Sequence, residues 1–372
     1  MTGVAAEKGS PMGHGKLDAI KYINEELGGI DGHPIEAIWY DNAYDAAKAA
    51  TIVKRLMADG ALFFTTNSSK MMMASMEIAN RAEFPGIASF SSPICTNPPK
   101  HIYAQMPDYG DDWAAFADYY LKNIWKGPGK PKMALHLLNN PTGAGALAAA
   151  TCLADELGIE IIATEEHTPV TSSEMESMVR IKALNPDVLF ISSTPAPTAV
   201  ILKAAYELGL YPGITIGCAH ASYTKALVDI ALSITSADAI EGVYGVFPTV
   251  AWGDDVPGMA KMTEYCLKLH PKDYGNMDYI TSWAEALIGA EILRNALKGA
   301  GYDVLARGDV ESWRATEKYG IQALDYDVEG LHGPAKYVAG DNRLDKSIRV
   351  FQVIDGVITA VSGWIDAPLI PY

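Results

Sequence analysis

Small hydroxyl and amide side chains recur directly after apolar, β-rich runs of the chain. Such strand ends are where open parallel sheets bind their ligands. A hydroxyl at the start of the following helix, together with the free backbone N–H groups there, can hold an anion. The pattern therefore predicts an anion-binding site beside an aromatic ring. In the N-terminal part the candidates are Asn67, Ser69, Phe90, Ser91 and Ser92.

The middle of the chain carries a second series of polar residues after apolar runs. The candidates there are Thr142, Thr194 and His220. Neutral hydrogen-bonding groups dominate both series. The same residue types are the ordinary helix caps of any α/β protein, so capping alone remains the alternative reading at each loop.

The usual catalytic motifs are absent from the sequence. There is no G-x-S-x-G, H-E-x-x-H or G-x-x-x-x-G-K-[ST] pattern, so esterase, zinc-protease and P-loop chemistry lack support. The eight histidines show no metal-ligand spacing, and most are expected on the surface or in packing. The four cysteines form no C-x-x-C pair, and two disulfides or four separate thiols both remain open.

One segment resembles a dinucleotide-binding turn. Gly143 and Gly145 belong to a G-x-G-x-x-A pattern that follows a predicted strand and opens a helix, with two glutamates about twenty residues later. However, the loop at 139–142 separates the strand from the first glycine, whereas a pyrophosphate turn begins almost at the strand's end. Close packing of a small-residue helix on its sheet is therefore preferred over a nicotinamide or flavin site.

Composition excludes several classes of protein. The 372 residues include 29 Lys and Arg against 45 Asp and Glu, a net charge of −16 that repels nucleic acid. No apolar run reaches the roughly 18 residues of a membrane span. The first ten residues lack the basic start and apolar stretch of an export signal.

The order of elements predicts an α/β fold with parallel sheets, because short β-rich runs alternate with segments of helical period. Asp45 is expected to cap a helix that ends at Gly60, and Asp355-Gly356 to form a hairpin turn. A turn-rich stretch at 126–131 separates two such series. The predicted strands are 35–39, 62–65, 86–89, 102–104, 132–138, 159–164, 187–192, 214–218, 242–246, 347–354 and 357–362.

Several segments, taken in order, resemble a known family. They are the G-G-I-D-G turn at 28–32, the segment at 40–50, and the closing pattern formed by 332–337, 340–342 and Asp355-Gly356. Together they resemble the type I periplasmic ligand-binding proteins, specifically the branched-chain amino-acid (Leu/Ile/Val) substrate-binding proteins of ABC importers.

The resemblance implies two doubly wound parallel-sheet lobes joined by three hinge crossovers, near 106–109, 247–250 and 330–334. Lobe 1 would comprise 1–107 plus 250–331, and lobe 2 would comprise 108–249 plus 332–372. It also implies that a first strand and a signal peptide precede Met1.

The implied function is that of a receptor and not an enzyme. It would need no cofactor, and its partners would be a small-molecule ligand and a membrane permease. It would not insert into the membrane itself, and it would act in the periplasm or at the cell surface. The alternatives left open are a two-domain NAD(P)-dependent enzyme that uses the Gly143 and Gly145 turn, and a cytoplasmic sensor domain of the same fold.

The resemblance also assigns roles to particular residues. Ser69 and Ser92 match hydroxyls that hold a ligand carboxylate, Phe90 would offer backbone groups, and Lys8 would line the mouth. Where relatives place the acid that meets a ligand ammonium, this chain has His220. Because an unpaired buried charge costs several kcal/mol, we expect a carboxylate ligand without a plain α-amino group. Phe90, Phe247 and Tyr279 are expected to favour an apolar or aromatic body.

Overall fold

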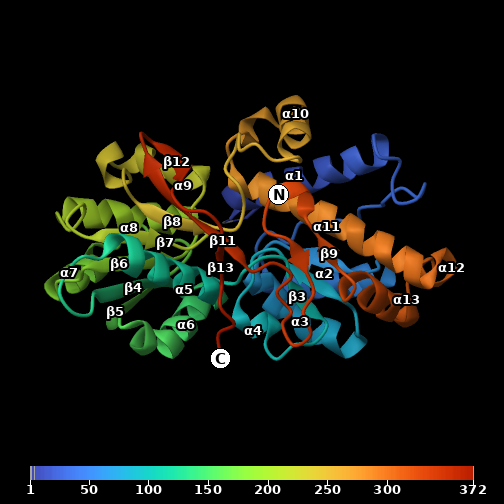
Figure 1. Cartoon of the computed structure of the whole chain (residues 1–372), viewed down its shortest axis with the longest axis horizontal. Helices are drawn as coiled ribbons and strands as arrows, with labels where there is room; N and C mark the ends of the chain where they lie inside the picture. Colours follow the sequence, from blue (N-terminus) through green and yellow to red (C-terminus); the bar gives the residue numbers. More distant parts are fainter. Residues whose placement is uncertain (1, 4, 372) are drawn as a thin grey trace. The chain divides into compact units, whose positions relative to one another are not determined.

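The computed structural model describes residues 2–3 and 5–371 and contains two compact units. Unit 1 is Met1–Met106 with Trp252–Asp345, and unit 2 is Pro107–Ala251 with Lys346–Tyr372. The chain therefore passes from one unit to the other three times, as the colours of Figure 1 allow the reader to follow. Each unit is described by itself below.

The third passage differs from the predicted one near 330–334, because the structure groups residues 332–345 with unit 1. Backbone hydrogen bonds explain the difference. Ala104 N–H donates to Asn342 O (2.9 Å), and Leu344 N–H donates to Ala104 O (2.8 Å). The Asn342 side-chain amide also donates to Ile102 O (2.7 Å). This segment thus runs along the last strand of the unit 1 sheet before the chain leaves it.

The sheet of unit 1 has three parallel strands in the order β1 (Phe64–Thr66), β2 (Gly86–Ala88) and β3 (Ile102–Ala104). These match the strands predicted at 62–65, 86–89 and 102–104. A short antiparallel pair, β9 (Asp325–Tyr326) with β10 (Ala335–Lys336), lies outside this sheet.

Helix α2 (Ala46–Ala58) begins and ends as predicted. The Asp45 carboxylate accepts from the N–H groups of Ala47 (2.8 Å) and Lys48 (3.0 Å), which are two of the donors that a helix start leaves unpaired. Val53 and Leu56 turn a buried face to the core. The chain leaves the helix through Gly60, whose φ of +78° suits glycine.

The strand predicted at 35–39 is wrong. Residues 34–42 form neither helix nor strand in the structure. At its start the segment is bonded to helix α1 instead of a strand: Ile35 N–H donates to the Asn24 side chain (2.8 Å), and the Asn24 amide donates to Ile35 O (2.9 Å). Alternating apolar residues give a strand only when a neighbouring strand pairs with them, and none of the described residues does so here.

Two long helices pack closely in unit 1. Helix α1 (Ala6–Glu25) contacts α11 (Met277–Ala300) along its length. A Cβ atom built on Gly15 would lie 2.4 Å from Tyr279 O, so the two helix backbones touch at this point. The remaining helices of the unit are α3 (Ser69–Ala82), α4 (Pro93–Thr96), α10 (Met259–Leu269), α12 (Tyr302–Leu305) and α13 (Val310–Ala315).

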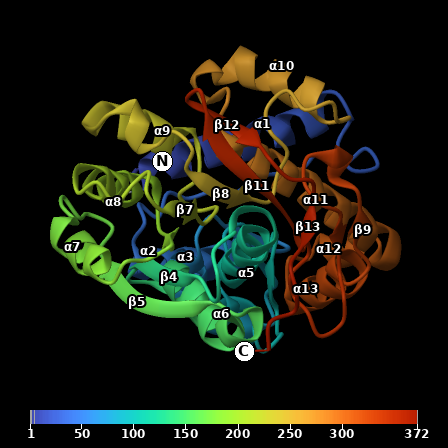
Figure 2. The same ribbon diagram turned by 60° about the vertical axis from the view of Figure 1, so that its left-hand side comes forward.

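Unit 2 is built on one eight-stranded sheet, with the order β12-β11-β8-β7-β6-β4-β5 and β13 paired to β11 (Figure 2). The strands from β5 to β8 are parallel, and β11 runs antiparallel to β8. The strands are β4 (Lys132–Leu138), β5 (Glu160–His167), β6 (Val188–Ser192), β7 (Thr215–Cys218), β8 (Tyr244–Phe247), β11 (Ser347–Ile354), β12 (Val357–Ala360) and β13 (Ile365–Asp366).

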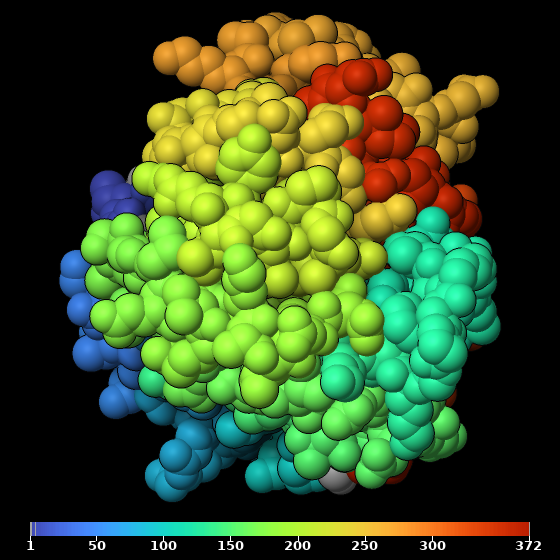
Figure 3. All heavy atoms as spheres, turned by 90° about the vertical axis from the view of Figure 1, so that its left-hand side faces the viewer, coloured from blue at the N-terminus to red at the C-terminus, as the bar shows by residue number. Residues whose placement is uncertain are grey.

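The predicted hairpin between β11 and β12 is confirmed. Asp355 and Gly356 have φ angles of 52° and 74°, the left-handed conformations that a two-residue hairpin turn needs. Helices alternate with the parallel strands, and those between 170 and 240 form the yellow-green surface seen in Figure 3. The helices of this unit are α5 (Tyr109–Tyr119), α6 (Pro141–Leu157), α7 (Met175–Ala183), α8 (Pro195–Glu207) and α9 (Lys225–Ile234).

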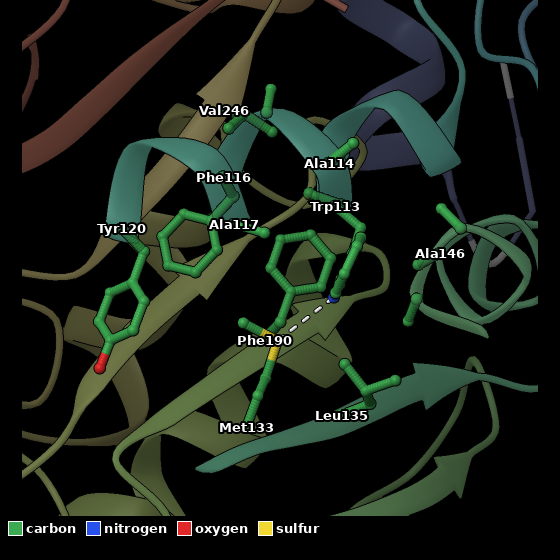
Figure 4. Packing of buried hydrophobic residues seen from close by; sticks show 14 of the residues in the cluster. Trp113, Ala114, Phe116, Ala117, Tyr120, Met133, Leu135, Ala146, Phe190 and Val246 are labelled. Carbon is green, nitrogen blue, oxygen red and sulfur yellow. Dashed lines mark hydrogen bonds between the residues drawn. The ribbon is translucent and has the colours of Figure 1, made fainter. Parts of the chain in front are cut away.

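The core of unit 2 fixes helix α5 on the sheet. Trp113 and Phe116 of α5 pack with Phe190 and Met133 of the sheet, and the Trp113 indole N–H donates to the Met133 sulfur (3.2 Å; Figure 4). A Cβ atom on Gly217 would lie 2.2 Å from the Phe116 ring, so β7 needs glycine where this ring crosses it. The close approach sets the start of α5 against the end of β7.

Candidate functional site

The carboxyl ends of β1 and β2 carry a partly buried polar network. Lys16 Nζ donates to Thr65 Oγ1 (2.6 Å) and Asn67 Oδ1 (3.3 Å), and it forms an ion pair with Glu285 Oε2 (2.8 Å). The Ser89 hydroxyl donates to the same Glu285 oxygen. Asn67 is therefore held in place by a lysine beneath it, and the Glu285 carboxylate, almost fully buried, is balanced by that lysine.

Ser69 is the first residue of helix α3 and lies two residues after Asn67 of this network. Its side chain is buried, at 1% exposed, and its Oγ has no hydrogen-bond partner among the residues that the structure describes. The side chain of the preceding residue, Ser68, does not cap this 14-residue helix. The N–H groups of the first turn therefore have no side-chain acceptor from the cap position. An orphaned hydroxyl at the positive end of a helix suits an anion such as a carboxylate.

Phe90 follows β2 and is buried against a cation. The Lys8 ammonium lies 3.9 Å from the centroid of the Phe90 ring and is bonded to the Asp278 carboxylate. This places a neutralised lysine on the aromatic ring of the strand end. The neighbouring Ser91 and Ser92 are buried too, and the Ser91 hydroxyl donates to Ser92 O (3.4 Å).

Tyr279 belongs to the core of helix α11. It is fully buried, packs with Trp252 and Trp283, and donates its hydroxyl to Asp18 Oδ2 (2.8 Å). Burial and the Asp18 carboxylate raise the pKa of this phenol far above its usual range, so it stays protonated. Its hydroxyl is thus committed to a carboxylate of its own unit.

His220 follows β7 in unit 2 and is paired with Asp112 of α5. Its Nδ1–H donates to Asp112 Oδ1 (2.7 Å), and its backbone N–H donates to Oδ2 (3.1 Å). The ring stacks on Tyr109 with centroids 4.9 Å apart, and it meets Phe247 edge-on at 6.1 Å. Both His220 and Asp112 are fully buried. The strand end therefore presents an oriented imidazole between two aromatic rings.

Thr142 and Thr194 lie at the starts of helices α6 and α8. Thr142 is buried and its carbonyl accepts from the Ser192 hydroxyl (3.0 Å), which ties the end of β6 to α6. Thr194 is the residue before α8, and its carbonyl accepts from the Thr198 hydroxyl (2.9 Å). These hydrogen bonds join the threonines to Ser192 and Thr198, whereas His220 is bonded to Asp112, so they place the predicted site residues of unit 2 in two groups.

The glycines at 143 and 145 do not form a dinucleotide turn. Helix α6 begins at Pro141, so both glycines lie within the helix, with Asn140 as its cap. A Cβ atom on Gly143 would lie 2.3 Å from Leu138 O, which shows why this position is glycine. The packing explanation is the one that the geometry supports.

Metal, thiol and membrane features complete the description. Among the described residues, no group of three or more His, Cys, Asp and Glu side chains could hold a metal ion. All four cysteines are free thiols. None of the helices in the described part of the chain combines the length and apolar character of a bilayer span.

Several functional contacts were missed by the sequence analysis. The sequence singles out neither Asp112 nor Tyr109, and the structure places both against His220. His136 and His167 were expected to be ordinary surface or packing histidines, whereas they are buried and bonded to each other (3.0 Å). No local sequence signal marks these pairs, since their members are 108 and 31 residues apart.

A family model described as periplasmic binding protein matches residues 1–357. The chain belongs to this family. The two-unit α/β structure, with parallel sheets and polar strand ends, is the fold that this membership requires. The predicted resemblance and fold class are therefore confirmed. No curated protein sequence matches the chain.

Solved structures of similar fold are substrate-binding proteins of transporters. A branched-chain amino acid ABC transporter protein from Thermus thermophilus with bound valine superimposes with a TM-score of 0.85 at 19% identity, covering 98% of this chain and 94% of that one. A fatty acid ABC transporter substrate-binding protein from Thermomonospora curvata gives 0.82 at 20% identity, covering 98% and 90%.

A third structure has an aromatic ligand. The solute binding protein from Rhodopseudomonas palustris BisB5 in complex with 3,4-dihydroxy benzoic acid gives a TM-score of 0.77 at 19% identity, covering 100% of this chain and 96% of that one. The periplasmic binding protein family and these structures are transporter binding proteins rather than enzymes.

Proposed function

We propose that the chain is the substrate-binding protein of an ABC importer, located in the periplasm or at the cell surface. Its ligand would be a small carboxylate with an apolar or aromatic body. Membership of the periplasmic binding protein family supports the transport role. The two units would close on the ligand by a hinge motion, and the closed form would be presented to a membrane permease.

The observation that supports a carboxylate ligand is the environment of the Ser69 hydroxyl. This hydroxyl is buried, has no partner among the described residues, and stands at the start of the 14-residue helix α3. A ligand carboxylate there would receive the hydroxyl and the uncapped N–H groups of the first turn. The similar structures are consistent with this chemistry, since valine, a fatty acid and 3,4-dihydroxy benzoic acid all carry a carboxylate.

The pairing of His220 argues against a plain amino acid. In unit 2, the Asp112 carboxylate accepts from two N–H groups of His220. A ligand ammonium at this strand end would therefore meet an imidazole and two aromatic rings instead of an open carboxylate. A neutral, flat or apolar ligand body fits the same surroundings without an unpaired charge.

Isothermal titration calorimetry with four carboxylates tests this proposal. The set is benzoate, 3,4-dihydroxybenzoate, hexanoate and valine, measured with the full chain. We expect an aromatic carboxylate to bind most tightly. Ser69→Ala should weaken that binding about tenfold or more, because a hydrogen bond to a charged group contributes about 1.5–3 kcal/mol.

The matched control is Ser233→Ala, which removes an exposed hydroxyl bonded to Ile230 O in α9 and should leave the dissociation constant unchanged. Tight binding of valine with no binding of the aromatic acids would contradict the ligand class. Unchanged affinity in Ser69→Ala would contradict the carboxylate position.

A further inference from the structure

A buried chain of hydrogen bonds crosses the sheet of unit 2. It begins at Ser193, at the end of β6, whose Oγ lies 2.6 Å from His167 Nε2 at the end of β5. His167 Nδ1 lies 3.0 Å from His136 Nδ1 on β4, the strand between them. His136 Nε2 in turn faces Ser177 Oγ (2.9 Å) and Glu174 Oε2 (3.3 Å). All five side chains are buried.

The far end of this chain has a fixed proton. The Ser177 hydroxyl donates to Glu174, either to Oε2 (2.7 Å) or to the backbone oxygen (2.9 Å). The Ser177 oxygen can therefore only accept from His136, and the Glu174 carboxylate also only accepts. Both neighbours require a hydrogen on His136 Nε2.

The contact between the two Nδ1 atoms then allows two states. Without an extra proton, His167 Nδ1–H donates to His136 Nδ1, and His167 Nε2 accepts from the Ser193 hydroxyl. With one extra proton on the histidine pair, His167 Nε2–H donates to Ser193 Oγ instead. This holds whichever ring carries the charge. Without the extra proton, the Ser193 hydroxyl hydrogen is used in the bond to His167, so Ser193 can only accept a hydrogen bond from a ligand. With the extra proton, that hydrogen is available, and Ser193 can donate a hydrogen bond to a ligand.

The charges around the histidine pair allow it one extra proton and oppose a second, which would charge both rings. Burial and the neighbouring His136 lower the pKa of His167 to about 3. Burial alone would raise the pKa of Glu174, but hydrogen bonds from His136, Thr171 and Ser177 outweigh it and lower the pKa to about 2, so a carboxylate faces His136. The other charged groups nearby, Glu165 of β5 and Arg180 of α7, form their own two-bond ion pair at 2.8 and 2.7 Å.

Ser193 lies where a ligand of unit 2 would bind. It follows β6 at the carboxyl edge of the parallel strands and directly precedes Thr194, the residue before α8. Among the described residues, its side chain has a hydrogen bond with His167 alone. One hydrogen-bonding capacity of this buried hydroxyl is therefore left over, and its direction depends on the proton count of the histidine pair.

We propose that Ser193 is a specificity-determining residue whose hydrogen-bond polarity is set by the His136–His167 pair. A ligand whose end facing unit 2 carries a hydrogen-bond acceptor binds the protonated pair, and one proton is taken up from solvent as it binds. This inference rests on the proposed function, and it adds that the carboxylate ligand carries a second acceptor, such as a carbonyl or a second carboxylate, at its far end.

Calorimetry in buffers of different ionisation enthalpy measures this proton directly. The probes are 4-acetylbenzoate, which offers an acceptor at its far end, and benzoate, which offers none. For 4-acetylbenzoate near neutral pH we expect the observed enthalpy to report uptake of up to about one proton per ligand, and the affinity to weaken up to about tenfold for each unit rise in pH. Benzoate should bind without uptake.

Ser193→Ala is the decisive variant, because it keeps both histidines and removes only the hydroxyl. The proton uptake should disappear, and 4-acetylbenzoate should lose its advantage over benzoate. His136→Gln should abolish uptake as well, and its fold is checked by the thermal transition. His33→Gln, at an exposed histidine of unit 1, is the matched control.

The outcomes separate this inference from the proposed function. If neither benzoate nor 4-acetylbenzoate binds, the proposed ligand class fails. If both bind and 4-acetylbenzoate takes up no proton, the ligand class stands and the role of Ser193 is overturned. Uptake that persists in Ser193→Ala would overturn it too, because the proton would then belong to another group, with His220 tested next by His220→Gln.

Discussion

The networks described above neutralise their buried acids with different chemistry in the two units. In unit 1, lysines do so: Lys16 pairs with Glu285, and Lys8 pairs with Asp278. In unit 2, histidines face the buried acids: His220 meets Asp112, and His136 meets Glu174. A lysine keeps its charge across the physiological range, whereas a histidine changes charge within it. Unit 1 also holds histidine–acid pairs outside its network, such as His332 with Asp345. Within the networks themselves, dependence on pH near neutrality should originate in unit 2.

The largest expected effect tests the fixed charges of unit 1. Lys16→Met leaves the Glu285 carboxylate buried without its cation, and we expect a loss of about 3 kcal/mol or more of unfolding free energy. Urea denaturation measures the loss, and hydrogen exchange should locate it in α1, α11 and the ends of β1 and β2. Lys21→Met removes an exposed lysine of the same helix from its pair with Glu25 and should cost less than about 0.5 kcal/mol. Equal losses in the two variants would contradict the role given to the buried pair.

Close helix packing gives the next largest effect, and it should be alike in both units. Gly15→Ala brings a Cβ to 2.4 Å from Tyr279 O in unit 1, and Gly143→Ala brings one to 2.3 Å from Leu138 O in unit 2. Each should lower the unfolding free energy by about 2 kcal/mol, because backbone must move to make room. The control is Gly9→Ala in α1, where nothing lies within 4 Å. It should stabilise the protein by up to about 1 kcal/mol, as alanine does in a helix. Stabilisation by all three changes would contradict the close contacts.

Acid sensitivity from His167 of unit 2 comes third. The pKa of His167 is lowered from its ordinary value of 6.5 to about 3, chiefly by burial. Below pH 6.5 the unfolded chain therefore binds more protons at this residue than the folded chain, and stability falls as pH falls. The slope reaches up to about 1.4 kcal/mol per pH unit. Glu174, with its pKa lowered from 4.5 to about 2, adds a loss only below about pH 4.5.

Glu174 contributes no loss between pH 6.5 and 4.5, so this window separates its effect from that of His167. Urea denaturation at steps of pH should show a shallower slope in His167→Gln than in the unchanged chain. His33→Gln in unit 1 should retain the full slope. A slope that survives in His167→Gln would assign the acid sensitivity to another group.

The smallest effect concerns the helix cap formed by Asp45 at the start of α2 in unit 1. Asp45→Ala removes the acceptor of two N–H groups at the start of α2 and should cost about 1 kcal/mol. Thermal unfolding at neutral pH measures it. Asp45→Asn keeps an acceptor oxygen and should recover most of the loss, which a purely electrostatic role of the carboxylate would not allow.

Local sequence signals predicted the elements that local interactions define. The cap at Asp45 and the hairpin turn at Asp355-Gly356 depend on neighbours in the chain, and the structure has both. The strand at 35–39 failed because a strand depends on a partner that no local pattern reveals. The third passage between units failed for a similar reason, since 332–345 is held by hydrogen bonds to β3.

The candidate site was predictable in part. Strand-end positions marked Ser69, Phe90 and His220 as residues to examine, because the rule for parallel sheets depends only on topology. The partners of these residues were not predictable. Whether a histidine faces an acid such as Asp112 depends on how α5 crosses β7, which the contact of Phe116 with Gly217 determines. The residue types in the sequence do not reveal these partners, because the partners are contacts between residues far apart in the chain.

The segment at 34–42 has a practical consequence for handling the protein. It lies outside every helix and sheet of the described residues, and 57% of the Trp39 side chain is exposed. Backbone groups in such a stretch can pair with the same stretch of another molecule. We therefore expect concentrated samples to self-associate through this segment first, and a lysine in place of Trp39 to raise the concentration at which light scattering begins to increase.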